Sequence, residues 1–239
     1  MNPYETRRLV DEYLLFHYGS DEEILPWKFG PREALGFPLR TVGHFARGDV
    51  DWALDLGCAV GRSAFELSRS CANVIAIDFS AAFIEAAKQL ARGETVTYQR
   101  LEEAQRQSAL EARLPDGVHP ERVHFEVGDA MDLRPDLGGF DRVHAANLLC
   151  RLPDPARLLE RLPGLVKPGG ELVLATPCTW LAEYTPPENW PTGSTFDWLK
   201  DRLGSDFDLL DTTDEPFLIR ETARKFQWTV SQVSRWRRL

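Results

Sequence analysis

The chain has 239 residues, of which 43% are hydrophobic, and a net charge of −9. This length and composition suit one sizeable domain with a packed core and argue against a disordered chain. The acidic balance weighs against a protein that follows the phosphate backbone of nucleic acid, because such proteins present basic surfaces. The one basic concentration, Arg235, Arg237 and Arg238, is more simply interpreted as a solvated tail.

The cysteines and the apolar runs indicate the compartment. Cys58, Cys71, Cys150 and Cys178 include no Cys-x-x-Cys pair, which favours reduced thiols and predicts no metal site. The first residues lack the apolar segment of a signal peptide, and no apolar run reaches membrane-spanning length. We therefore expect a cytoplasmic protein that binds neither membrane nor nucleic acid.

In chain order, residues 1–48 are predicted to be a helical region, with one apolar-rich helix over 4–18 that ends at Gly19 and a short helix from Arg32. From residue 49 onward, short strand patterns alternate with helical patterns. The predicted strands are 52–56, 74–78, 123–127, 140–146, 171–176, 207–212 and 226–233. The predicted helices are 63–70, 81–91, 155–165 and 196–203.

One connection is unusually long for a link between a helix and the next strand. Residues 93–121 are polar and irregular, and we expect an insertion there with a helix around 102–113. The whole chain, 1–239, is predicted to be one domain, in which 1–48 form a lid and 49–239 form the core.

The alternation of strands and helices predicts an α/β fold, with a mostly parallel seven-stranded sheet and helices on both faces. Ligands of such sheets bind outside the carboxyl ends of the strands. Five positions follow those ends directly: Gly57, Asp78, Asp129, Asn147 and the step from Thr176 to Pro177.

The segment Asp55-Leu-Gly-Cys-Ala-Val-Gly61 joins the first strand to the first helix through a glycine turn. Glycine allows a sharp turn and the close approach of a ligand. Asp78 follows Asp55 by 23 positions, and an acidic residue at about that distance can bind ribose hydroxyls. The turn lacks both the dinucleotide fingerprint and the lysine of a phosphate loop. We therefore expect a nucleoside cofactor on this sheet.

These motifs resemble those of the class I S-adenosylmethionine-dependent methyltransferases, which have a Rossmann-like fold. The resemblance covers about residues 50–176. It implies that Asp55 supports the turn and that the turn lines the methionine part of the cofactor through Gly57, Cys58, Ala59 and Gly61.

The same resemblance assigns the nucleoside part of the cofactor. Asp78 is expected to bind the ribose, with Phe79 and Ser80 beside the adenine. Asp129 and Ala130 match the motif at the adenine edge, and Asn147 is expected near the transferable methyl. Simpler interpretations remain open, because the acidic residues are also able to cap turns and the glycines also serve close packing. Cys58 is interpreted as a small apolar filler rather than a nucleophile.

The acceptor is expected to be a small molecule. Adenine and glutamine N-methyltransferases carry Asp/Asn-Pro-Pro-Tyr after the fourth strand, where this chain has Ala146-Asn-Leu-Leu149. The two ends of the chain, Tyr4–Gly19 and Pro216–Trp228, resemble the 4-mercaptohistidine N-methyltransferases, which are similar to the C-terminal domain of ovothiol synthase. Phe29-Gly-Pro31 and the insertion through Arg113–Gly117 also match.

This second resemblance implies a reaction. The methyl of S-adenosylmethionine passes to the ring nitrogen nearer the side chain of 5-thiohistidine (4-mercaptohistidine), giving ovothiol A and S-adenosylhomocysteine. A separate sulfoxide synthase is then the expected partner in supplying the acceptor. The cofactor brings the electrophile, so the protein mainly supplies position and desolvation.

The N-terminal helix is predicted to fold over the site as a lid. His17 and Tyr18 are the catalytic candidates, because a neighbouring base can remove a ring proton from the acceptor. The substrate candidates are Tyr4, Glu5, Tyr13, Asn147, Trp180, Tyr184, Arg220 and Glu221. Arg220 or Arg224 is suggested as the carboxylate anchor and Glu5, Glu221 or Asn147 as the ammonium anchor. Ordinary packing of the aromatics and a surface ion pair at Arg220-Glu221 remain the alternatives.

Three other functions stay open at this point. The chain is alternatively a methyltransferase for another small acceptor, such as an amine or a phenol. It is also conceivable as a non-catalytic protein that binds the cofactor and acts as a partner. A nucleic-acid methyltransferase is the third and most distant alternative, because of the acidic balance.

Overall fold

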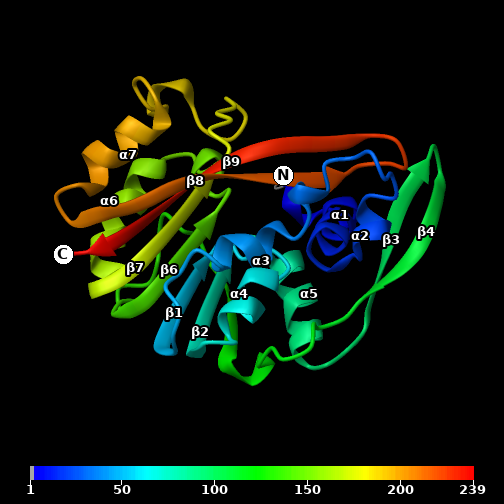
Figure 1. Ribbon diagram of the computed structural model, residues 1–239, viewed down its shortest axis with the longest axis horizontal. Helices are drawn as coiled ribbons and strands as arrows, with labels where there is room; N and C mark the ends of the chain where they lie inside the picture. Colours follow the sequence, from blue (N-terminus) through cyan, green and yellow to red (C-terminus); the bar gives the residue numbers. More distant parts are fainter. Residues whose placement is uncertain (1–2) are drawn as a thin grey trace.

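The computed structural model describes residues 3–239. Its centre is a seven-stranded sheet in the order β5-β2-β1-β6-β7-β9-β8 (Figure 1). The strands in that order are β5 (Val123–Val127), β2 (Cys71–Asp78), β1 (Val50–Leu56), β6 (Phe140–Ala146), β7 (Val166–Thr176), β9 (Phe226–Arg238) and β8 (Phe207–Arg220). β9 pairs antiparallel with β7 and with β8, and the other neighbouring strands of this sheet pair parallel. The predicted mostly parallel α/β sheet of seven strands is confirmed.

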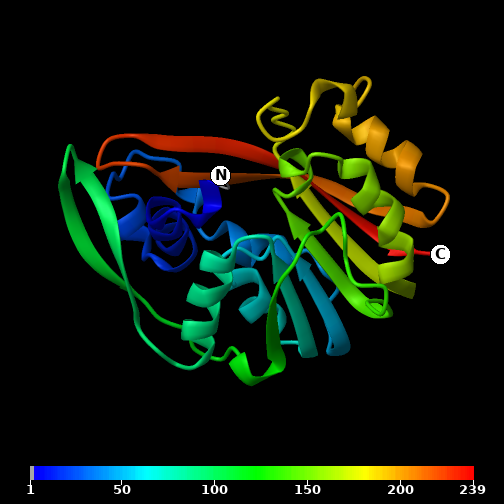
Figure 2. The ribbon, with the colours of Figure 1, turned by 180° about the vertical axis from the view of Figure 1, so that it is seen from behind.

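Helices cover both faces of the sheet (Figures 1 and 2). On one face lie α3 (Phe37–Val42), α4 (Arg62–Leu67) and α5 (Ala81–Ala91). On the other face lie α6 (Pro155–Leu165) and α7 (Thr195–Leu203). Each face has its own cluster of buried apolar side chains, so the sheet is buried on both sides as a parallel sheet requires.

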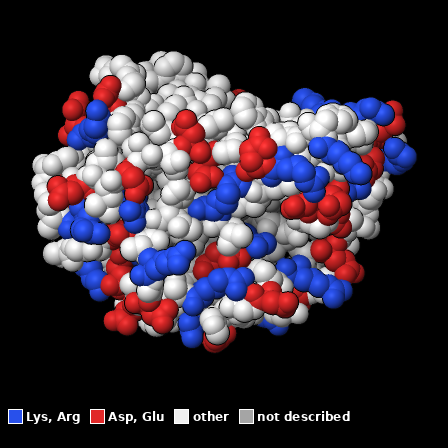
Figure 3. Space-filling model, in the orientation of Figure 1, with Lys and Arg blue, Asp and Glu red and all other residues white. Residues whose placement is uncertain are grey.

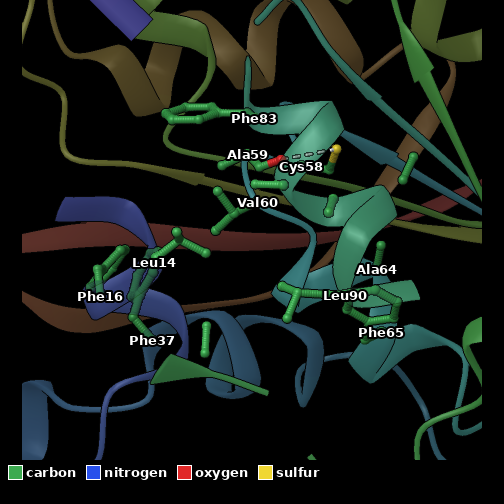
Figure 4. Packing of buried hydrophobic residues seen from close by; sticks show 14 of the residues in the cluster. Leu14, Phe16, Phe37, Cys58, Ala59, Val60, Ala64, Phe65, Phe83 and Leu90 are labelled. Carbon is green, nitrogen blue, oxygen red and sulfur yellow. Dashed lines mark hydrogen bonds between the residues drawn. The ribbon is translucent and has the colours of Figure 1, made fainter. Parts of the chain in front are cut away.

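The N-terminal region packs on the face that holds α4 and α5. It begins with a short 3-10 helix, η1 (Pro3–Glu5), and continues as α1 (Arg7–Tyr18) and α2 (Asp21–Ile24). The predicted helix over 4–18 is interrupted because the Thr6 hydroxyl caps α1 by accepting from the Leu9 N–H. Leu14 of α1 points toward Val60 of the glycine turn (Figure 4), so the N-terminal helix lies directly on that turn.

The helix predicted over 102–113 is wrong. The insertion forms an antiparallel hairpin of β3 (Val96–Glu103) and β4 (Arg106–Ala112). Its residues include many good helix formers, which explains the sequence-based expectation. Tertiary packing overrides that preference: alternate residues such as Tyr98 and Ala112 are fully buried, whereas their neighbours are exposed.

The last two strands extend well past the rest of the sheet as a long arm (Figure 1). Thr176, the last residue of β7, is opposite Gln232, which is itself opposite Asp214 of β8. Arg220 lies six residues further along β8, which places it about 20 Å beyond the end of β7. The arm packs on α1, with Phe16 and Phe217 centred 6.1 Å apart.

Charges of both signs are interspersed on the face shown in Figure 3, with an uncharged area at the top. This distribution gives that face no continuous basic stripe of the kind that tracks nucleic acid. Within residues 3–239, no helix is both long and apolar enough to cross a membrane.

Candidate cofactor and acceptor site

Backbone strain gathers at the carboxyl ends of three neighbouring strands. Ala59 after β1, Asn147 after β6 and Cys178 after β7 have φ of 48°, 56° and 52°. The only other non-glycine residue with positive φ among residues 3–239 is Ala104, in the hairpin turn. Such conformations are uncommon for residues with a Cβ and cluster at functional sites. The strain marks the edge of the sheet where α/β proteins bind their ligands.

The glycine turn requires glycine at both ends. Gly57 and Gly61 have φ of 70° and 88°. A Cβ on Gly61 would lie 2.8 Å from the ring of Phe125, and one on Gly57 would lie 3.1 Å from Leu148. Substitution at either position would therefore shift the turn as well as strain its backbone.

Asp55 supports the turn from beneath and does not face the ligand edge. One carboxylate oxygen accepts from the Ser63 hydroxyl at 2.6 Å, and the other lies 2.8 Å from Nδ1 of His144. The remaining ring nitrogen of His144 bonds to Thr41, and all three polar partners of this network are buried. His144 escaped the sequence analysis, although a histidine within an otherwise apolar buried strand was a signal that could have found it.

Asp78 is held at the end of β2 by two backbone N–H groups. Its carboxylate accepts from Ala59 at 2.8 Å and from Ser80 at 2.9 Å. Burial is the main cause that raises the pKa of Asp78 to about 6. Each oxygen keeps a further lone pair, which suits two adjacent ribose hydroxyls. Phe79 beside it is 64% exposed, so its ring is free to contact a base.

The adenine-edge motif lies next to Asp78 because β5 pairs with β2. The Gly128 N–H donates to the backbone oxygen of Asp78 at 3.0 Å. One carboxylate oxygen of Asp129 accepts from Met131, and the other has no acceptor role among the described residues. Ala130 is buried in the core below. The two carboxylates and the exposed ring therefore fit the nucleoside of S-adenosylmethionine.

The N-terminal segment is fastened over this edge at four points. The Ser80 hydroxyl donates to the Tyr4 backbone oxygen, and the Glu5 carboxylate accepts from the Ala81 and Ala82 N–H groups that begin α5. The Tyr18 hydroxyl donates to the Val60 oxygen at 2.8 Å, and Arg62 donates to the His17 oxygen at 2.9 Å. These contacts hold the N-terminal segment on the glycine turn and on the start of α5. Glu5 serves there as the cap of a helix rather than as a free anchor.

Two tyrosines of the N-terminal segment meet a third from the loop after β7. Tyr4 lies 6.2 Å from Tyr13 and 6.4 Å from Tyr184, measured between ring centres, and Tyr13 lies 4.8 Å from Phe83. We call Tyr4, Tyr13 and Tyr184 the tyrosine cluster. Burial raises the pKa of Tyr4 and raises that of Tyr13 to about 12, so both phenols stay protonated at neutral pH.

Arg151 adds a positive charge to the tyrosine cluster. It ends the short helix η4 (Leu149–Arg151) that follows β6, and its guanidinium lies 4.7 Å from the centre of the Tyr184 ring. Its electrostatic neighbours include all three tyrosines of the cluster. Sequence analysis missed this residue because nothing in the local pattern after β6 showed that the loop turns toward the N-terminal segment.

His17 and Tyr18 do not have the geometry of catalytic residues. Burial is the main cause that lowers the pKa of His17 to about 3, and its Nδ1 has no partner among residues 3–239. A base with so low a pKa holds a proton poorly at neutral pH. The Tyr18 hydroxyl is committed to the Val60 oxygen. In the structure, both residues help to hold α1 on the glycine turn, Tyr18 through its hydroxyl and His17 through its backbone oxygen.

Arg220 does not reach the tyrosine cluster. Its guanidinium donates to the Thr222 oxygen, to the Glu23 oxygen and to the Glu102 carboxylate, at 3.1, 2.7 and 2.8 Å. All three nitrogens are therefore engaged in tying α2, β3 and β8 together. The prediction that Arg220 anchors the substrate is corrected on this ground and by its distance along the arm.

Glu221 and Trp180 also have internal partners. The Glu221 carboxylate pairs with Gln227 and Lys225 in the turn between β8 and β9. The Trp180 ring nitrogen donates to the Thr195 hydroxyl at 2.9 Å. The Trp180 ring packs edge-on against Trp198 of α7. Of the predicted substrate residues, the structure brings Tyr4, Tyr13, Tyr184 and Asn147 to the strand ends, and not these two.

Asn147 connects β6 to β9 at the strand ends. Its side-chain oxygen accepts from the Ser231 hydroxyl at 2.6 Å, and its backbone N–H donates to the Ala175 oxygen. Leu148 next to it packs on Gly57, so Asn147 lies beside the glycine turn. Asn147 therefore lies at the edge of the sheet where the resemblance to the methyltransferases predicts the transferable methyl.

Two cavities lie away from this edge. One of about 420 Å³ is lined by aromatic residues of the α2–α3 connection and of the β8–β9 turn, such as Trp27, Phe29 and Trp228. The other, of about 350 Å³, is a charged groove between α1, β3 and the end of β8, and we call it the charged groove. Its charged lining comprises Arg7, Arg8, Asp11, Glu12, Arg100, Arg220 and Glu221. Within residues 3–239, no group of three or more His, Cys, Asp or Glu side chains is placed to hold a metal ion.

Comparison with known proteins identifies the class. The sheet order and the strained turn beside Asp78 are those of a class I S-adenosylmethionine-dependent methyltransferase. Residues 54–174, just over half of the chain, match the model of the methyltransferase domain family. The chain belongs to this family.

Relatives and solved structures support the class without fixing the acceptor. The O-methyltransferase cnsE of Penicillium expansum is 28% identical over 221 residues, 88% of this chain and 71% of that protein. A ubiquinone biosynthesis O-methyltransferase of Coxiella burnetii is 26% identical over 52% of this chain, which spans only 42% of the relative.

Two solved structures share the fold. The N-methyltransferase NodS of Bradyrhizobium japonicum, in complex with S-adenosylhomocysteine, has a TM-score of 0.56 at 16% identity and covers 96% of this chain and 98% of its own. A methyltransferase of Methanosarcina mazei has a TM-score of 0.56 at 20% identity, over 83% of this chain and 96% of its own. These likenesses show the fold, and the acceptor must be argued from the site.

Proposed function

We propose that the chain transfers the methyl group of S-adenosylmethionine to the ring nitrogen nearer the side chain of 5-thiohistidine, giving ovothiol A. The observation that carries this proposal is the tyrosine cluster, which joins the N-terminal segment to the loop after β7 and packs on Phe83 at the start of α5, close to Asp78 at the end of β2. Flat aromatic walls suit a planar imidazole acceptor. Of the two ends whose motifs suggested this acceptor, the N-terminal one contributes Tyr4 and Tyr13 to the cluster.

The residues of the chain have three tasks in this reaction. When bound, S-adenosylmethionine supplies a sulfonium methyl group, and cleavage of its S–C bond leaves S-adenosylhomocysteine. Asp78 and Asp129 hold the nucleoside, while the turn from Gly57 to Gly61 fixes the methionine part. The tyrosine cluster orients the acceptor ring and, together with the fastened N-terminal segment, excludes water.

The choice of atom is the demanding step, because the thiolate of the acceptor is a better nucleophile than its ring nitrogen. The raised pKa of Tyr13, about 12, keeps its phenol protonated at neutral pH. A protonated phenol is a hydrogen-bond donor, and the thiolate is the strongest acceptor on the substrate. A sulfur held by phenol donors is turned away from the methyl, which leaves the nitrogen lone pair in line with it.

The test is mass spectrometry of the product formed from 5-thiohistidine and methyl-labelled S-adenosylmethionine, with fragmentation to locate the label. We expect one label on the ring nitrogen. Label on sulfur, or no product from a protein that binds S-adenosylhomocysteine by calorimetry, would contradict the proposal. Asp78→Asn is the control for enzyme-dependent transfer.

A second candidate is methyl transfer to oxygen of another small acceptor, and it is favoured by relatives that are named O-methyltransferases. A panel of small phenols, carboxylates and imidazoles separates the two. Turnover of a phenol with none of 5-thiohistidine would favour this candidate. A cofactor-binding protein without activity would release no S-adenosylhomocysteine with any acceptor.

Proposed partners and location follow from the acceptor. We propose that a separate sulfoxide synthase supplies the thiohistidine, that nucleic acid and membranes are not substrates, and that the protein works in the cytoplasm. In a direct check, binding to DNA should stay at background level at every salt concentration.

A further inference from the structure

Arg151 presents a free edge of its guanidinium at the tyrosine cluster. Its Nη1 donates to the backbone oxygens of Cys150 and Thr179, at 3.0 and 3.2 Å. Among the described residues, Nε and Nη2 have no hydrogen-bond acceptor, and no carboxylate forms an ion pair with Arg151. These two nitrogens carry the parallel N–H groups of a guanidinium. That is the edge which binds the two oxygens of a carboxylate side by side.

The position of this edge is fixed from both sides. The two backbone acceptors hold Nη1, and the Tyr184 ring lies 4.7 Å below the guanidinium carbon. Stacking on a ring face leaves the in-plane N–H groups open. The side chain is partly buried, so a partner there would be held more strongly than on an open surface.

Two other arginines near α1 are already occupied. Arg62 bonds to the Glu66 carboxylate and to the His17 oxygen, at 2.9 Å each. Arg220 has a partner for each guanidinium nitrogen. Arg151 is therefore the cation at the tyrosine cluster that is prepared for an external anion.

We propose that Arg151 binds the carboxylate of the methyl acceptor and thereby makes the site selective for amino acids over the corresponding amines. This inference rests on the proposed function, because it concerns the same acceptor. The bidentate contact fixes the α-carbon end of the acceptor, while the tyrosine cluster holds its ring.

The experiment compares 5-thiohistidine with its decarboxylated amine, 5-thiohistamine, on the wild type and on Arg151→Gln. We expect the wild type to prefer the amino acid by about 10- to 100-fold in kcat/KM, as for a charge-assisted pair of hydrogen bonds. Arg151→Gln should lose that preference by raising KM for the amino acid only. Arg151→Lys keeps the charge but not the paired N–H groups, so its preference for the amino acid should lie between those of the wild type and Arg151→Gln.

Binding provides a second readout. Titration of 5-thiohistidine into the complex with S-adenosylhomocysteine should show the same 10- to 100-fold weakening in Arg151→Gln, with unchanged affinity for S-adenosylhomocysteine itself. Arg224→Gln is the matched control, because Arg224 is exposed on the distant arm over Trp27 and should behave as the wild type.

Two outcomes would overturn the inference while the proposed function stands: equal turnover of both acceptors by the wild type, or equal losses on both acceptors in Arg151→Gln. A wild type that binds S-adenosylhomocysteine but methylates neither compound would instead overturn the proposed function, and the inference with it.

Discussion

Helix α1 separates two regions that both contain arginine side chains and that differ in what those arginines bind. On one side, Tyr13 and His17 face α5 and the tyrosine cluster. On the other, Arg8 and Glu12 face the charged groove. At 3.6 residues per turn, the centres of these two pairs lie about 140° apart around the helix.

The charged groove holds both signs, and its charges satisfy each other. Arg220 and Arg100 both bond to the Glu102 carboxylate and to the Glu23 oxygen. Although burial opposes ionisation of Glu102, hydrogen bonds from Ser108 and Arg100 hold its pKa below the ordinary value. The side with the tyrosine cluster is different, because Arg151 keeps two nitrogens without acceptors. Free donors, rather than the number of charges, distinguish a binding site from a structural cross-link.

The largest expected effect is on stability, in Arg220→Ala. Removing this buried guanidinium leaves Glu102 with fewer partners, and we expect a loss of about 3 kcal/mol in unfolding free energy. For a chain of this size that is a fall of about 6–12 °C in Tm. KM for 5-thiohistidine should not change, and Arg224→Ala should alter neither quantity. A raised KM with unchanged Tm would restore Arg220 as the substrate anchor.

Asp78→Asn should weaken binding of S-adenosylhomocysteine by about 10- to 100-fold, because the ribose hydroxyls lose a charged acceptor. Since the pKa of Asp78 is about 6, wild-type affinity should also fall as the pH drops below 6. Calorimetry at pH 5, 6 and 7.5 checks both statements. If the affinity of Asp78→Asn fell with pH as it does in the wild type, the pH dependence would belong to a group other than Asp78.

His17→Gln should make the protein less sensitive to acid. The pKa of His17 is about 3 in the folded chain and 6.5 ordinarily, so the unfolded state binds more protons below pH 6.5 and stability falls there. Between pH 7.5 and 5 the wild type should lose up to about 2 kcal/mol more than the variant. Asp78 acts in the opposite direction between pH 3.8 and 6, and the comparison with the variant cancels it.

Urea unfolding at the two pH values measures this difference, with the exposed His124→Gln as control. If the variant lost as much stability in acid as the wild type, His17 would not be the buried neutral group described above. Activity at pH 7.5 should be retained in His17→Gln, since the residue packs the lid rather than accepts a proton.

The smallest effect is expected in Tyr18→Phe, which removes the hydrogen bond from α1 to Val60. We expect a loss of about 1 kcal/mol in the free energy of unfolding and a lower affinity for S-adenosylhomocysteine. Tyr98→Phe is the matched control, because the Tyr98 hydroxyl is buried without a partner among residues 3–239. The control should be as stable as the wild type or more stable. Equal losses in both variants would show that the hydroxyl of Tyr18 has no special role.

The sequence was sufficient for the sheet and for the cofactor edge. Strands β5 and β6 begin and end at the predicted residues. The pattern is strongest in β6, because a parallel strand buried on both faces is mostly apolar. It was not sufficient for the β3–β4 hairpin, whose residues favour a helix and are held as strands by distant partners such as Arg220.

The residues around the acceptor were harder to predict from the sequence, because they too depend on contacts between distant segments. Tyr4 and Tyr13 were singled out from the chain itself, but which arginine faces them depends on how far the β8–β9 arm extends and how the loop after β6 turns. Neither property has a local signature. Arg151 and Arg220 could therefore be told apart only by their partners in three dimensions.

The most direct test is a crystal structure of the chain with S-adenosylhomocysteine and 5-thiohistidine. Our account predicts the ribose at Asp78, the imidazole within the tyrosine cluster and the carboxylate on Nε and Nη2 of Arg151. An acceptor bound in the charged groove, with its carboxylate at Arg220, would contradict it.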